Sequence, residues 1–140
     1  MSEPIREVRR RIRTDHRQLV ESVDDCADRV ADRWDTARTT DGSAVVDSLR
    51  SELERTGSLE RLRLTLVDVV AAAGYELPAE PVATPPYVVV TSRGPILRAT
   101  IDPGRFVIRF DAFEVVRNRA SDRPPAYRRR DGTRITISLE

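Results

Sequence analysis

Residues 87–110 read YVVVTSRGPILRATIDPGRFVIRF, and this stretch decides the fold class. Apolar and polar side chains alternate along it, and the tripeptides Arg93-Gly94-Pro95 and Asp102-Pro103-Gly104 interrupt the alternation. A period of two is typical of strands with one buried face, and short segments rich in Gly and Pro are typical of turns. The stretch therefore predicts strands at 87–92 and 96–101 and the beginning of a third at Phe106.

The alternation continues toward the C-terminus. It predicts the third strand over 106–117, a short strand over 127–130 and a last strand over 133–139, with Asp131-Gly132 as the turn between the last two. Because successive side chains of a strand point to opposite faces, the apolar positions should face the core. The side chains expected together on the exposed face are those of Arg98, Arg109 and Arg134.

Upstream of residue 74 the apolar period changes to three and four residues, which indicates helices. Residues 4–36 predict one long helix, whose apolar stripe is interrupted only near Asp15 and His16. A second helix runs to about Arg55, and a third, 59–73, is apolar nearly all round and should be central. The expected fold is α+β, with three N-terminal helices packed on one face of a C-terminal antiparallel meander of four to five strands. We expect a single domain over 1–140, with a helical part at 1–74 and a sheet part at 87–140.

The composition excludes several classes of protein. A chain of 140 residues buries roughly 70% of its unfolded surface, so no cofactor or disulfide is needed for stability. The single cysteine, Cys26, excludes an internal disulfide, and its place on the apolar stripe predicts a small core residue. The most apolar segment carries Arg61, Arg63 and Asp68, so it is too charged to span a bilayer. We expect a cytoplasmic protein with no cofactor, no metal site and no membrane partner.

The cationic residues are all of one type. The chain has 24 arginines, no lysine, 23 acids and a net charge of +1. Arginine without lysine, with abundant Asp, Val, Ala and Thr, suggests a GC-rich genome and a salt-adapted cytoplasm. Salt-adapted proteins usually carry a large negative surplus, so a near-neutral chain is basic for such surroundings. This balance hints at an anionic partner.

The sheet region holds much of the arginine surplus. Residues 87–140 carry eleven arginines and six acids, and guanidinium groups bind phosphate in a bidentate manner. The candidate nucleic-acid or anion-binding residues are Arg98, Arg109 and Arg134, with Arg128, Arg129 and Arg130 near the rim of the face. The phenylalanines belong to the core side, so binding would be led by phosphate rather than by stacked bases. The alternative is a solvated face whose arginines pair with Asp111, Asp122 and Asp131.

The predicted long helix carries a second group of arginines. Residues 1–20 hold six arginines and three acids, whereas residues 21–36 hold six acids and two arginines. Because this polarity opposes the helix macrodipole, we consider a solvated face screened by salt, a basic end that meets an anionic surface, and antiparallel self-pairing in a homodimer. The candidate anion-binding residues here are Arg9, Arg10 and Arg13. The stripe of Asp24, Asp28, Asp32 and Asp35 is more typical of hydrated helix surface than of a metal site.

Catalytic signals are few. His16 is the one histidine, and the sequence holds no serine elbow, phosphate-binding loop, GxGxxG or HExxH pattern. No catalytic residue is assigned, and a place at the helix surface or boundary is the default for His16. A deep pocket that contains His16 with a carboxylate in hydrogen-bond reach would favour an enzyme. A helix–turn–helix DNA reader is disfavoured, because the third helix lacks a polar outward face.

Three segments of the second half stand out, namely Ala73-Gly74-Tyr75-Glu76-Leu77-Pro78, the run from Pro85 to Pro95, and Leu97-Arg98-Ala99-Thr100. They resemble a small family of uncharacterised haloarchaeal proteins. The helical segment from Asp25 to Trp34 fits the same resemblance, which covers most of the chain. The resemblance implies a salt-adapted, cytoplasmic origin, and it transfers no catalytic or binding residue.

These observations lead to three hypotheses, in order of preference. The first is a non-enzymatic cytoplasmic interaction module whose arginine surfaces contact an anionic partner, RNA or a nucleoprotein. The second is a protein–protein or self-association module built on the long N-terminal helix. The third is a small enzyme that uses His16.

Overall fold

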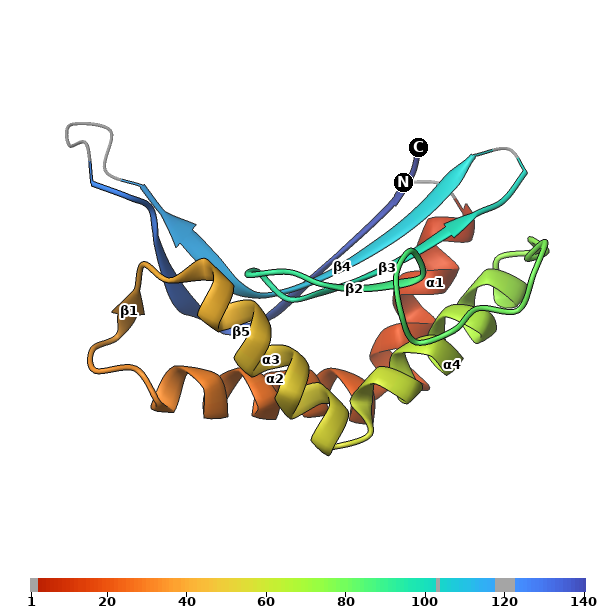
Figure 1. Ribbon diagram of the computed structural model, residues 1–140. Coiled ribbons are helices and arrows are strands. Elements are labelled where there is room, and N and C mark those ends of the chain that lie inside the picture. Colours follow the sequence, from red (N-terminus) through yellow and green to blue (C-terminus); the bar gives the residue numbers. More distant parts are fainter. Residues whose placement is uncertain (1–2, 103, 118–122) are drawn as a thin grey trace.

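The computed structural model describes residues 3–102, 104–117 and 123–140. This part of the chain has four helices, one more than predicted, and five strands (Figure 1). The helices are α1 (Glu3–Thr14), α2 (Arg17–Asp32), α3 (Gly42–Arg55) and α4 (Ser58–Ala72). The strands are β1 (Arg38–Thr39), β2 (Val88–Val90), β3 (Pro95–Thr100), β4 (Arg105–Val116) and β5 (Ala126–Leu139). The turn predicted at Asp102-Pro103-Gly104 includes Pro103, which lies outside the described residues.

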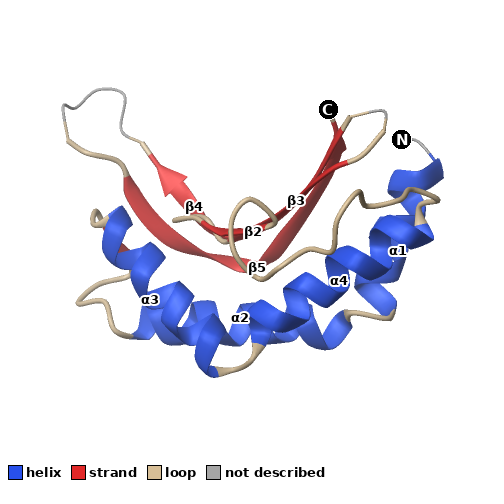
Figure 2. Cartoon of the chain, turned by 45° about the vertical axis from the view of Figure 1, so that its right-hand side comes forward, coloured by secondary structure: helices blue, strands red, loops and turns tan. Residues whose placement is uncertain are grey.

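The strands form one antiparallel sheet in the order β1-β5-β4-β3-β2. The predicted meander is confirmed, since β2, β3, β4 and β5 each pair with the next strand along the chain. β1, which lies within the region expected to be wholly helical, was not predicted. The helices form a layer against one face of the sheet, and no described helix covers the other face (Figure 2). The sheet is bent so that this uncovered face is concave.

The predicted single helix over 4–36 is wrong, because the chain divides into α1 and α2 at Asp15 and His16. The amides of Asp15 and His16 both donate to the Arg11 carbonyl, at 2.8 and 3.2 Å, which ends the regular bonding of α1. The division falls in the gap of the apolar stripe between Ile12 and Leu19, which are both buried. Each helix can thus turn its own apolar face to the core.

A buried carboxylate joins α2 to α3. The side chain of Glu52 on α3 is 4% exposed and accepts hydrogen bonds from Arg33 at 2.7 Å and from Arg55 at 2.8 Å. The hydrogen bond from Arg55 is the main reason that the pKa of Glu52 lies below its ordinary value, and it outweighs the opposing effect of burial. The ion pairs therefore offset the cost of placing a carboxylate in the interior.

β5 is one strand of 14 residues, so the predicted turn at Asp131-Gly132 and the division into two strands are wrong. The pairing with β4 changes register at this point, because Asp111 pairs with Arg134 whereas Phe113 pairs with Arg129. β5 has more residues than β4 between these two pairs. The excess forms a bulge within a continuous strand rather than a hairpin turn.

The turn between β2 and β3 packs against β4 near this bulge. The Arg93 carbonyl accepts hydrogen bonds from the amides of Ala112 and Phe113, at 2.7 and 2.9 Å. Gly94 has a φ of 145°, and a Cβ at this position would lie 1.8 Å from the Phe110 carbonyl oxygen. The close approach of the two backbones therefore requires glycine.

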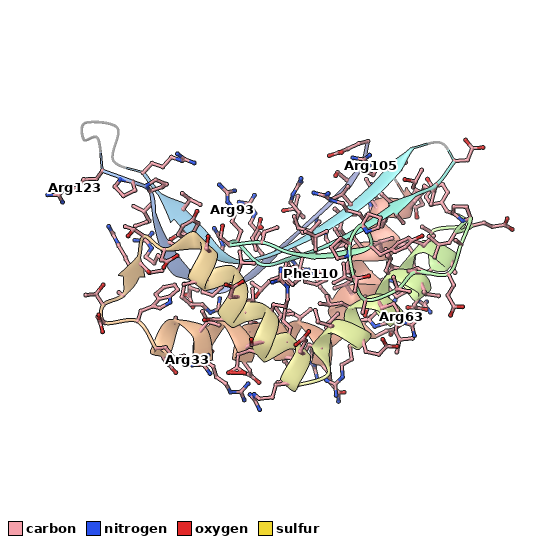
Figure 3. All side chains as sticks on the ribbon, viewed as in Figure 1. Arg33, Arg63, Arg93, Arg105, Phe110 and Arg123 are labelled. Atoms are coloured by element: carbon pink, nitrogen blue, oxygen red, sulfur yellow. The ribbon has the colours of Figure 1, made fainter. Side chains whose placement is uncertain are left out.

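The core lies between the sheet and the helical layer. Leu97, Phe106, Ile108 and Phe110 are fully buried and face the helices, as the alternation predicted. Phe110 lies between the two layers in Figure 3. Cys26 is also fully buried in this core, as expected. Within the described chain, no helix combines the length and the apolar character needed to cross a bilayer.

Candidate nucleic-acid interface

The register of the sheet places Arg98, Arg109 and Arg134 together on the uncovered face, as predicted. Arg98 pairs with Val107, Arg109 pairs with Ile96, and Arg134 pairs with Asp111. Paired residues share a face, and the neighbours Leu97, Ala99, Ile108, Phe110 and Ile135 belong to the core on the opposite face. We call this surface the open face, and it comprises Ile96, Arg98, Val107, Arg109, Asp111, Arg134, Thr136 and Ser138.

Two apolar side chains lie beneath the arginines of the open face. Ile96 is 8% exposed and Val107 is 2% exposed, although no described helix covers them. They are the cross-strand partners of Arg109 and Arg98, whose side chains are half-buried. The aliphatic stems of arginine cover such neighbours while the guanidinium groups stay in water. Shielding by these stems is consistent with the burial of Ile96 and Val107.

The side chains of Arg98, Arg109 and Arg134 form no hydrogen bond or ion pair with any described residue. The pairing with Asp111 and Asp131 that the alternative of a solvated face included is not found for these arginines, although Asp111 lies directly opposite Arg134. Asp122, the third predicted partner, lies outside the described residues.

Three arginines surround a single carboxylate at the β1 end of the sheet. Arg128 Nε donates to Glu114 Oε1 at 2.7 Å, and Arg130 Nη1 donates to Glu114 Oε2 at 3.4 Å. The hydrogen bond from Arg128 lowers the pKa of Glu114 against the effect of desolvation, and the charges of Arg130 and Arg38 add to it. Glu114 follows the core residue Phe113 by one position, and its paired residue Arg128 precedes Arg129, the partner of Phe113, by one position. Both therefore lie on the same side as the open face.

Arg129, the remaining candidate in this run, points the other way. Its side chain is 16% exposed, and it donates to Asp24 at 2.8 Å and to Asp28 at 2.9 Å, both on α2. It also donates to the Ala112 carbonyl at 2.9 Å. Arg129 was predicted near the rim of the exposed face, whereas its side chain points to α2. Its role in anion binding stays a prediction. Asp24 and Asp28 were expected to be hydrated surface; they remain partly exposed, and they also attach α2 to the sheet.

The candidates on α1 do not extend the open face. Arg9 donates to the Ile135 carbonyl at 2.9 Å, and Arg10 donates to both oxygens of Glu7, at 2.6 and 3.1 Å. Arg13 is exposed and has no partner among the described residues. Because the predicted long helix is divided, its basic and acidic halves are separate helices. The straight element on which antiparallel self-pairing depended is therefore missing, and self-association stays a prediction.

His16 has a carboxylate within hydrogen-bond reach. Its Nε2 lies 2.6 Å from Asp68 Oδ2 and its Nδ1 lies 3.3 Å from Thr65 Oγ1. Arg11 donates to both Asp68 oxygens, at 2.9 and 3.0 Å. The hydrogen bond from Arg11 is the main reason that the pKa of Asp68 lies below its ordinary value, and the contact with His16 adds to it. Burial acts in the opposite direction, because it disfavours the charged carboxylate.

The carboxylate expected beside a catalytic His16 is present, and the space next to it is a small hollow. The hollow beside it has a volume of about 260 Å³ and is lined by Asp15, Gln18 and Leu64 among others. Both ring nitrogens of His16 already have partners, and Thr65 is 2% exposed. The use of His16 by an enzyme stays a prediction. Through these hydrogen bonds, Arg11, His16, Thr65 and Asp68 connect α1 and the start of α2 to α4.

A pocket of about 190 Å³ at the edge of β3 contains residues that the sequence analysis did not single out. It is lined by Pro78, Pro86, Tyr87, Arg98, Thr100 and Arg105, with Ala99. Arg105 lies two positions before Val107 and so shares the open face. Figure 3 shows Arg93 and Arg105 on the uncovered side of the sheet, whereas Arg33 and Arg63 lie among the helices. Alternation alone identifies Arg105, but the predicted strand began one residue later.

Comparison with known proteins gives a family without a function. A family model described as a domain of unknown function (DUF7988) matches residues 6–140. No curated protein and no solved structure matches the chain.

Proposed function

The chain belongs to the DUF7988 family of unknown function, and we propose from its own geometry that it is an interaction module that binds the phosphate backbone of structured RNA through the open face. RNA that is free and RNA within a nucleoprotein present the same phosphates. The setting that we propose is the cytoplasm of a haloarchaeon, in keeping with the resemblance and with the all-arginine composition.

One observation carries the proposal. Arg98, Arg109 and Arg134 gather on a concave sheet face and bond to no carboxylate in the described chain. Arg11, Arg33 and many other arginines of the helical layer are instead paired with acids. A guanidinium group that has no internal partner keeps its donors available for phosphate oxygens.

The chemistry of the open face favours backbone contacts over base contacts. Single-stranded RNA is usually bound by aromatic side chains on which bases stack. Phe106, Phe110 and Phe113 of the sheet are all buried on the helix side. Contacts between arginine and phosphate carry no sequence information by themselves. The proposed partner is therefore a structured RNA that is recognised by charge and shape.

A purely structural role for the same arginines is the competing explanation. Arg98 and Arg109 are the cross-strand partners of Val107 and Ile96, and shielding of these apolar residues by the arginine stems would alone give a reason for their presence. The two explanations differ in what the guanidinium charge does. Replacement by glutamine removes the charge and keeps much of the stem, so stability would change little while RNA binding would fall.

The test compares two triple variants with the same change in charge. The first is Arg98→Gln, Arg109→Gln and Arg134→Gln. The matched control replaces three exposed arginines on three helices, Arg29, Arg50 and Arg61, with glutamine. Binding to a labelled RNA hairpin is measured by fluorescence anisotropy over a series of salt concentrations. Circular dichroism checks that each variant is folded.

We expect the open-face variant to bind far more weakly than the control. Each phosphate contact contributes roughly 0.7–0.9 to the slope of log K against log salt concentration, so the loss of three contacts lowers the slope by roughly 2–3. Two results would overturn the proposal. One is no binding by the unmodified chain at the lowest salt that keeps it folded, and the other is an equal loss in both variants.

A further inference from the structure

We propose that the pocket at the edge of β3 binds a phosphate monoester, the terminal phosphate of an RNA being the form that fits the open face. That the phosphate belongs to an RNA rests on the proposed function. That the pocket binds a phosphate at all rests on the residues that line it.

The polar residues that line the pocket all carry hydrogen-bond donors in their side chains. Arg98 and Arg105 supply two guanidinium groups, and neither forms an ion pair with a described residue. Tyr87 and Thr100 add two hydroxyl groups. No carboxylate is among the described residues that line the pocket. A cluster of donors without an internal acceptor is suited to an anion that brings several acceptor oxygens.

The backbone of β3 adds one more donor at the same place. The Arg98 amide donates to the Tyr87 carbonyl at 2.8 Å, on the β2 side of β3. The Ile101 amide donates to Gly104 at 2.7 Å, on the β4 side. Because the direction alternates along a strand, the Thr100 amide points to the β2 side. The pairing with β2 does not extend to Thr100, so this amide faces the pocket instead of a strand.

The size and charge of the pocket favour a terminal phosphate over a phosphate within a chain. A volume of about 190 Å³, with Pro78 and Pro86 on its wall, is of the size of one phosphate group rather than of a whole nucleotide. A phosphodiester carries one negative charge. A monoester carries close to two at neutral pH, because its second pKa is about 6. Two guanidinium groups match the dianion.

The position of the pocket links it to the open face. Arg98 belongs to both, and Arg105 lies on β4 two residues before Val107. An RNA whose end enters the pocket would continue along the sheet toward Arg109 and Arg134. The pocket thus fixes where the RNA begins on a surface that otherwise reads only charge.

The experiment compares two RNA hairpins that differ only in a 5′-phosphate or a 5′-hydroxyl. We expect the unmodified chain to bind the phosphorylated hairpin at least about tenfold more tightly, as is usual for a pair of charge-assisted hydrogen bonds. Arg105→Gln should remove this preference. The control Arg134→Gln, on the open face but outside the pocket, should weaken both hairpins and keep the preference. Equal binding of the two hairpins by the unmodified chain overturns the inference and leaves the proposed function standing.

A second arm separates RNA ends from small phosphates. The thermal unfolding of the full chain is followed with inorganic phosphate, with a nucleoside monophosphate and with sulfate at the same ionic strength. A rise in Tm with the phosphates that Arg105→Gln abolishes, in a chain that binds no RNA, supports the pocket and overturns the proposed function. No rise and no preference for a 5′-phosphate overturn the pocket. Because Arg105 is exposed, the variant is expected to fold, and Thr100→Val serves as an independent check.

Discussion

Replacement of Arg129 by methionine tests whether this arginine fastens α2 to the sheet. The side chain is 16% exposed, and it bonds to Asp24, Asp28 and the Ala112 carbonyl. Removing one partner of a fully buried ion pair costs roughly 3–5 kcal/mol. Here water reaches the acids, since Asp24 is 30% exposed and Asp28 is 59% exposed. Asp24 also keeps its bonds from the amide and hydroxyl of Thr133. We therefore expect a loss of about 2–3 kcal/mol in the free energy of unfolding.

The assay is urea unfolding followed by circular dichroism, with Arg128→Met as the matched control. Arg128 is the next residue in the strand, is 44% exposed and pairs with one carboxylate, Glu114. Its replacement should cost less than about 1 kcal/mol. A double-mutant cycle of Arg129→Met with Asp24→Asn should show a coupling above about 1 kcal/mol.

Equal losses for the two methionine variants would refute this reasoning. So would a coupling near zero between Arg129 and Asp24. Either result would mean that the bonds between α2 and β5 contribute no more than ordinary surface contacts. The distinction between paired and unpaired arginines, on which the open face depends, would then lose its energetic basis.

Three further predictions follow from single residues. Gly94→Ala should lower the free energy of unfolding by more than about 2 kcal/mol, because its Cβ would lie 1.8 Å from the Phe110 carbonyl oxygen. Gly132 also has a positive φ but lies in open space, so Gly132→Ala should lower it by about 1 kcal/mol in the same urea assay. The pKa of Glu52 in the folded state lies below 4.5, its ordinary value. The stability that Glu52 contributes is therefore fully present above pH 4.5, and it is lost as the pH falls through the lowered pKa. Glu52→Gln should therefore flatten the acid side of the Tm-against-pH curve, and an unchanged curve would contradict the prediction. His16→Ala should lower the free energy of unfolding by about 1 kcal/mol through the lost contact with Asp68, as measured by urea unfolding.

The faces of the sheet could be predicted because strand alternation is a strict local rule. It placed Arg98, Arg109 and Arg134 together from their spacing relative to the apolar residues. It could not identify which arginines are free, because this depends on partners that are remote in sequence. Arg129 is paired with Asp24, which precedes it by 105 residues.

At two places tertiary contacts override the local sequence signal. Asp131-Gly132 has the composition of a turn, but pairing with β4 on both sides keeps β5 continuous. If β5 is taken as one strand, alternation from Arg134 sends Arg129 to the helix side, where it is found. The period of residues 4–36 is helical throughout, and the break at His16 is accompanied by a contact with Asp68 on α4, 52 residues away.

The outer edge of β5 bears on whether a second copy of the chain can add to the sheet. β1 pairs with β5 only at Tyr127 and Arg128, so the rest of that border has no neighbouring strand in the described chain. An uncovered strand border is a template on which a second chain can add. Here Asp24 occupies the Thr133 amide and Arg9 occupies the Ile135 carbonyl. These side chains come from α2 and α1, so the helical layer occupies two of the backbone groups to which an added strand would bond.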